Sequence, residues 1–166
     1  LYRAFDMEAK GWKMVDPGSA AGLDASMAKA FDRDQNWFGY YWSPTAMIGK
    51  YGMIMMPFGV DFAGSENWDG CIVKPEQECV GPKPTSWTKS EVNSVITADL
   101  QKRAPMIADY IAARTFPGPV INGMLAYMTD NQATGEDATI EFLMKHEDIW
   151  STWVSADAAA KIKAAL

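Results

Sequence analysis

The sequence predicts an α/β fold with parallel strands. In the first 58 residues, helical and strand-like patterns alternate in the order helix, strand, helix, strand, which is typical of a parallel sheet covered by helices. The 166 residues are 48% hydrophobic, which is enough to bury a core. We therefore expect a globular protein built around an open sheet.

The first helix and the first strand follow from side-chain spacing. Small and apolar residues recur at helical intervals over residues 19–33, directly after a Pro-Gly pair. Residues 37–42, "WFGYYW", predict a strand because aromatic side chains favour the pleated surface. Strand alternation places Tyr40 and Trp42 on one face and Tyr41 on the other.

The next elements are signalled by capping and turn residues. Ser43 is predicted to be an N-cap with Pro44 at the first helical position, which opens a short helix that ends near Tyr51. Residues 52–58, "GMIMMPF", predict a buried strand. The polar stretch 59–87 is rich in Gly and Pro and predicts a long loop.

The second half is predicted to be helical after one strand. Residues 92–97 predict the strand, and they need partner strands that this half lacks. Helices are expected from near Pro105, over residues 119–131, and from Thr134, which stands in capping-box spacing with Asp137.

The last predicted helix carries an apolar stripe. Trp150 and Trp153 are spaced at i and i+3 and share this stripe with Phe142, Leu143 and Ile149, so we expect them to be core residues.

Charge and motif content exclude several function classes. The net charge is −6 and the basic residues are scattered, so no face is predicted to track a phosphate backbone, and we expect no nucleic-acid partner. With one histidine and no nucleophile-elbow, zincin or phosphate-loop motif, we expect no enzyme, no catalytic or metal site and no cofactor. The apolar runs are shorter than the ~20 residues that a membrane span needs.

The two cysteines lie close together in "GCIVKPEQECVG". Cys71 and Cys79 flank a polar, Pro-containing loop, which favours a local disulfide over free thiols and suits an exported protein.

The run "WFGYYWSPT" places five aromatic side chains in six positions. At the carboxyl end of a strand, such rings can hold a quaternary ammonium through their negative faces, and the N–H groups of Thr45 and Ala46 at the next helix can meet a carboxylate. The other interpretation is that Tyr40, Tyr41 and Trp42 are ordinary core or surface residues of a strand.

The segments "DPGSAAGLDASMAKAF", "WFGYYWSPTAMIGKYGMIMMPFG", "WTKSEVNSVITAD" and "MLAYMTDNQATGEDATIEFLMKHEDIWSTWV" resemble, in this order, the later half of the glycine betaine-type substrate-binding proteins of ABC importers. The resemblance implies a periplasmic-binding-protein-like fold of type II, in which two α/β lobes close on the solute. It also implies an aromatic box that holds the quaternary ammonium. By position, Trp42 is one wall, Tyr40 or Tyr41 is its neighbour, and Trp87 lies at the lobe crossing, where it faces the cleft or packs at the hinge.

The resemblance also implies an organisation and partners. Residues 1–86 would form part of the second lobe and residues 87–166 would return to the first, so the chain would cover part of each lobe and lack the N-terminal half of the same protein. The partners would be a small onium solute and a membrane permease, in a periplasmic or other extracytoplasmic location. Two alternatives are a carbohydrate-binding module that stacks sugars on its aromatic residues and a scaffold without a small ligand.

Overall fold

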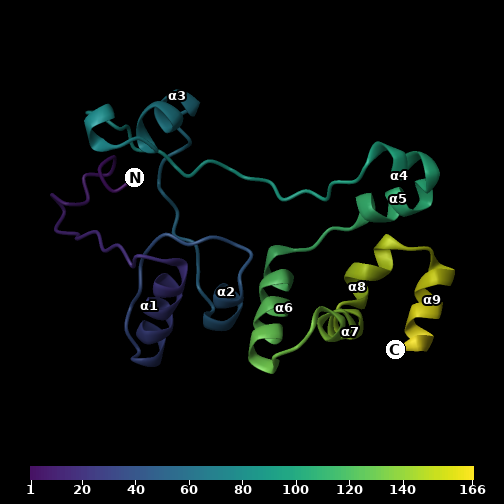
Figure 1. Ribbon diagram of the computed structural model, residues 1–166. Coiled ribbons are helices and arrows are strands. Elements are labelled where there is room, and N and C mark those ends of the chain that lie inside the picture. Colours follow the sequence, from purple (N-terminus) through teal and green to yellow (C-terminus); the bar gives the residue numbers. More distant parts are fainter. The chain divides into compact units, whose positions relative to one another are not determined.

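In the computed structural model, which describes residues 1–166, the chain is helical and contains no β-strand (Figure 1). The predicted α/β fold, with the sheet-based two-lobed architecture that the resemblance implied, is therefore wrong for this structure. The α-helices are α1 (Ala20–Asp32), α2 (Ala46–Tyr51), α3 (Ser65–Asn67), α4 (Ala98–Arg103), α5 (Pro105–Ala113), α6 (Gly118–Asn131), α7 (Gly135–Lys145), α8 (Glu147–Trp150) and α9 (Ala156–Ala165). A short π-helix, η1 (Trp68–Ile72), and two 3₁₀ turns, η2 (Glu76–Glu78) and η3 (Ser151–Trp153), complete the set.

The three predicted strands are irregular segments between helices. Residues 37–42, most of 52–58, and 92–97 have strand-like composition, yet none of them joins a ladder. Their apolar side chains are largely exposed, with Ile54 at 82% and Val95 at 91%. Strand propensity measures how a side chain fits beside cross-strand neighbours, so composition alone forms no sheet where pairing is absent.

Three helix predictions that rest on local signals are confirmed. Helix α1 spans residues 20–32 against the expected 19–33, and α5 begins at the expected Pro105. Helix α7 begins with the predicted capping box, in which Thr134 and Asp137 each accept a hydrogen bond from the other's backbone N–H. These signals succeed because they depend on residues within one or two turns.

The chain divides into two compact units, each made of two segments. One unit contains Leu1–Ser26 and Met55–Val92, and the other contains Met27–Ile54 and Asn93–Leu166. The lobe boundary expected between residues 86 and 87 remains a prediction.

In the unit that contains α6 to α9, the core is the predicted aromatic stripe. Phe142, Trp150 and Trp153 are buried, and the ring of Phe142 stacks on that of Trp153 with their centroids 5.5 Å apart. The indole N–H of Trp150 donates a 2.7 Å hydrogen bond to the carbonyl of Leu143, so this buried donor is satisfied. The interpretation of these residues as core is confirmed, but they lie on α7, α8 and η3 and not on the single helix that the sequence predicted.

The other unit contains polar contacts and one covalent bond, in addition to aromatic packing around Trp68. Cys71 and Cys79 form a disulfide with their Cα atoms 5.0 Å apart, as the sequence predicted. Arg3 donates hydrogen bonds to the carbonyls of Cys79, at 2.8 Å, and Lys74, at 3.1 Å. The fully buried Thr85 accepts a 2.8 Å hydrogen bond from the N–H of Ala63. The stretch expected to be a loop therefore carries short helices, and side-chain hydrogen bonds tie it together.

Candidate functional site

Three of the predicted ligand contacts, Tyr40, Tyr41 and Trp42, form a cluster of aromatic rings. Tyr41 stacks on Trp42 with centroids 4.6 Å apart and planes 27° apart, and Tyr40 lies 6.1 Å from Trp42. Strand alternation predicted that Tyr41 would point away from the other two. Because the segment is not a strand, both tyrosines contact the tryptophan.

The cluster keeps a large accessible surface. Trp42 is 43% exposed and Tyr40 is 54% exposed, whereas Tyr41 is half-buried. These values differ from those of the core, where Trp150 is 2% exposed. The rings therefore form a supported but accessible aromatic surface. Of the alternative interpretation, a core role for Trp42 is wrong, whereas an ordinary surface role stays open.

The turn after the cluster differs from the prediction. Helix α2 begins at Ala46, and its N-cap is Thr45, whose hydroxyl accepts a hydrogen bond from the N–H of Ile48 at 3.3 Å. Ser43 is therefore not the N-cap, and Pro44 is not the first helical residue; the Ser43–Pro44 peptide bond is cis.

Asn122 of α6 holds this turn. Its side-chain oxygen Oδ1 accepts a 2.8 Å hydrogen bond from the N–H of Thr45 and a 3.4 Å hydrogen bond from the hydroxyl of Ser43. The N–H of Thr45, expected to meet a ligand carboxylate, is thus already bonded within the protein. Sequence reasoning missed Asn122, although one signal was present: it is a lone amide within the apolar run "VINGMLAYM" of a predicted helix.

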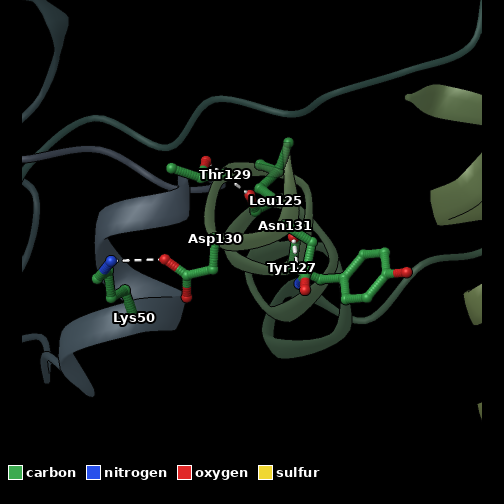
Figure 2. Close-up of polar contacts among 6 residues, drawn as sticks. All are labelled: Lys50, Leu125, Tyr127, Thr129, Asp130 and Asn131. Atoms are coloured by element: carbon green, nitrogen blue, oxygen red, sulfur yellow. Dashed lines mark hydrogen bonds and ion pairs between the residues drawn. The ribbon is translucent and has the colours of Figure 1, made fainter. Parts of the chain in front are cut away.

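Helices α2 and α6 also meet through a cation and an anion. Figure 2 shows Lys50 of α2 pointing toward Asp130 of α6, with a distance of 2.5 Å between Nζ and Oδ1. The hydrogen bond to the Asp130 carboxylate, together with its charge, raises the pKa of Lys50. Both side chains are more than 40% exposed, so the pair contributes little to stability but marks the register of the two helices.

Trp87, the remaining predicted ligand contact, belongs to the other unit. Its ring meets that of Trp68 edge-on with centroids 5.0 Å apart, and Phe62 lies 6.1 Å from Trp68. Trp68 is buried, whereas Trp87 is 42% exposed. Trp87 is therefore anchored on one side by a second aromatic group, and its role toward a ligand stays a prediction.

Two cavities are lined by residues other than these predicted contacts. One of about 370 Å³ is lined by residues that include Arg3, Asp6 and Glu76, and the other, of about 280 Å³, by residues that include Trp150 and Lys163. No group of three or more His, Cys, Asp or Glu side chains is placed to hold a metal ion. No helix is both long enough and apolar enough to cross a membrane.

Comparison with protein families decides the relationship. Residues 1–145 match the family described as the substrate binding domain of the ABC-type glycine betaine transport system. The chain belongs to this family. The match covers the aromatic cluster, the turn and α2 to α7, so the resemblance seen in the sequence is confirmed. Searches of curated proteins and of solved structures found no match.

Membership sets the broad role. The family binds a substrate for a transport system and is not a catalytic family. The match gives no support to the expectation that an earlier half of the same protein is missing.

Proposed function

We propose that the protein binds a small quaternary ammonium or related onium solute and delivers it to the permease of an ABC importer on the extracytoplasmic side of the membrane. The solute class comprises glycine betaine, choline, carnitine, trimethylamine N-oxide and dimethylsulfoniopropionate. Family membership supports substrate binding for transport. The disulfide between Cys71 and Cys79 suits an oxidising compartment outside the cytoplasm.

The observation that carries the choice of ligand is the accessible cluster of Trp42, Tyr40 and Tyr41. A quaternary ammonium has no N–H to donate, so a protein attracts it mainly through the negative faces of aromatic rings, and tryptophan is the strongest of these. Tyr41 supports the Trp42 ring from one side, while 43% of the Trp42 surface stays available. The cluster has the chemistry of one wall of an onium site.

The energy of such a wall sets a requirement on the bound state. An exposed cation–π contact contributes ~0.5–1 kcal/mol and a desolvated one ~2 kcal/mol. A micromolar dissociation constant corresponds to ~8 kcal/mol, so three exposed rings fall well short of it. Tight binding therefore requires that the ammonium be covered on its far side and that water be excluded from the rings.

A calorimetric titration panel tests the proposal. The panel contains the onium solutes above and 3,3-dimethylbutanoate, which replaces the ammonium nitrogen of glycine betaine with carbon. We expect at least one onium solute to bind and the carbon analogue to bind ~30-fold more weakly than glycine betaine, the ratio that a loss of ~2 kcal/mol produces.

Each other outcome refutes the proposal in a specific way. Equal affinity for glycine betaine and its carbon analogue would mean a hydrophobic wall without a cation site. Binding of glucose or maltose in place of the onium solutes would favour a carbohydrate-binding module. No heat and no ligand-dependent rise in Tm for any solute would favour a scaffold.

A further inference from the structure

Asn122 is a buried polar side chain within the apolar run "VINGMLAYM" of α6. It is 7% exposed, and its Oδ1 accepts the hydrogen bonds from Thr45 and Ser43. Burying an amide is costly unless it is hydrogen-bonded, and an apolar residue would fill the same space without that requirement. The amide is therefore explained better by what it holds than by packing.

What Asn122 holds is the turn that carries Trp42. Ser43 follows Trp42 directly, so both bonded groups lie within three residues of the ring. The bond from Thr45 spans 77 residues of sequence, which makes it a tertiary contact and not part of the local helix cap. A displacement of this turn displaces the Trp42 backbone with it.

Gly49 brings α2 close enough for this bond to form. A Cβ atom at Gly49 would lie 2.2 Å from the backbone oxygen of Asn122 and 3.2 Å from Cβ of Ala126. No side chain fits in that space, so a larger residue must push α2 away from α6. The close approach at Gly49 and the hydrogen bonds of Asn122 are thus two parts of one contact, with Lys50 and Asp130 next to it.

We propose that Asn122, with the close approach at Gly49, is a positioning residue for the onium site: it holds the turn Ser43–Thr45 against α6 and so sets the orientation of the Trp42 ring. The inference rests on the proposed function, because the orientation of the Trp42 ring affects binding only if the ring contacts an onium solute. Asn122 does not touch the ligand. It acts through Trp42.

The test combines two pairs of matched variants. Asn122→Leu removes the acceptor and keeps a side chain of similar size, whereas Asn122→Asp keeps an oxygen that both donors can reach. Gly49→Ala adds a methyl group where Asn122 blocks it, whereas Gly123→Ala adds a methyl group on α6 where nothing lies within 4 Å. Both glycines are helical, so both alanine variants gain the same helix propensity and differ only in the clash.

One readout is ligand-independent. The protein is labelled with 5-fluorotryptophan, and among its seven tryptophans the ¹⁹F resonance of Trp42 is assigned by its absence in Trp42→Phe. We expect Asn122→Leu and Gly49→Ala to move the Trp42 resonance. Asn122→Asp and Gly123→Ala should leave it close to its parent position. The resonance of Trp150, in the core, reports whether each variant is folded.

The second readout is affinity for glycine betaine by calorimetry. We expect Asn122→Leu and Gly49→Ala to lose at least about tenfold, because a ring turned away from the cation forfeits most of its attraction. Asn122→Asp and Gly123→Ala should stay within about threefold.

The outcomes separate this inference from the proposed function. If the parent protein binds no onium solute, the proposed function fails, and positioning is judged by the Trp42 resonance alone. An unmoved Trp42 resonance in a folded Asn122→Leu or Gly49→Ala variant overturns the inference. An affinity for glycine betaine equal to that of the parent protein in either variant also overturns the inference. If Asn122→Leu loses the Trp150 resonance and is therefore unfolded, the Gly49→Ala and Gly123→Ala pair decides.

Discussion

Replacing Trp42 with alanine separates an onium site from a packing role. The side chain is 43% exposed and contacts Tyr41 and Tyr40, so its removal exposes part of two rings but opens no core cavity. Replacing a fully buried tryptophan with alanine costs ~3–5 kcal/mol, and about half of that, ~2 kcal/mol, is expected at this half-exposed position. The effect on stability is therefore moderate.

The effect on affinity is expected to be of similar size in free energy, which makes it easy to measure as a ratio of dissociation constants. The proposed function requires the ring to be covered in the bound state, so its contact with the ammonium is expected to contribute ~2 kcal/mol, the upper range for cation–π pairs. At ~1.4 kcal/mol per tenfold, Trp42→Ala lowers the affinity by about 30-fold or more. Trp42→Phe keeps a π face and should retain more affinity than Trp42→Leu, which keeps apolar bulk without one.

The assay pairs two measurements on each variant. Calorimetry with glycine betaine, or with the onium solute that binds best, gives affinity, and urea unfolding gives stability. Phe31→Ala is the matched control, because Phe31 is an exposed aromatic residue of the same unit, at 59%, and its ring packs on Tyr51 with centroids 4.6 Å apart. It should leave the affinity within about threefold.

The reasoning is refuted if folded Trp42→Ala binds onium solutes as tightly as the parent protein. It is also refuted if Phe and Leu at this position are equivalent, since the π face would then contribute nothing.

Two further predictions concern the unit that contains α6 to α9. Trp150→Ala should lower the free energy of unfolding by about 3–5 kcal/mol in urea titrations, because it empties the core and leaves the carbonyl of Leu143 without its donor; a loss below about 1 kcal/mol would contradict this. Hydrogen bonds from the Thr134 side chain and backbone lower the pKa of Asp137, so they stabilise the fold above the ordinary aspartate pKa and are lost as the pH falls through the lowered value. Thr134→Ala should therefore lower Tm at neutral pH, and its difference from the parent should narrow in Tm scans below about pH 4; a constant difference would show that the Asp137 carboxylate plays no part.

Some of the local structure in this chain could be predicted from neighbouring residues. The capping box of Thr134 and Asp137 and the helix over residues 20–32 each depend on contacts within a few residues, and each prediction is confirmed. The prediction that Trp150 and Trp153 are core residues is also confirmed, although their partners include the more distant Phe142 and Phe116. The pairing of Cys71 with Cys79 also spans a short loop. Family resemblance was likewise visible in the order of the segments.

The presence or absence of pairing between distant segments could not be predicted from the sequence in the same way. Residues 37–42 and 92–97 have the composition of strands, but a strand exists only where another backbone meets it, and here none does. The prediction that Tyr41 and Trp42 point to opposite faces of a strand is wrong for the same reason, and the two rings stack.

The setting of the candidate site likewise depends on the tertiary structure. The aromatic run of the candidate site is present in nine consecutive residues of the sequence. Its support is not, because Asn122 reaches Thr45 across 77 residues and Gly49 matters only where α6 passes beside it. A hydrogen bond or a steric limit between two helices depends on how closely the helices approach in space. No periodic pattern in the sequence predicts how closely two distant helices pack.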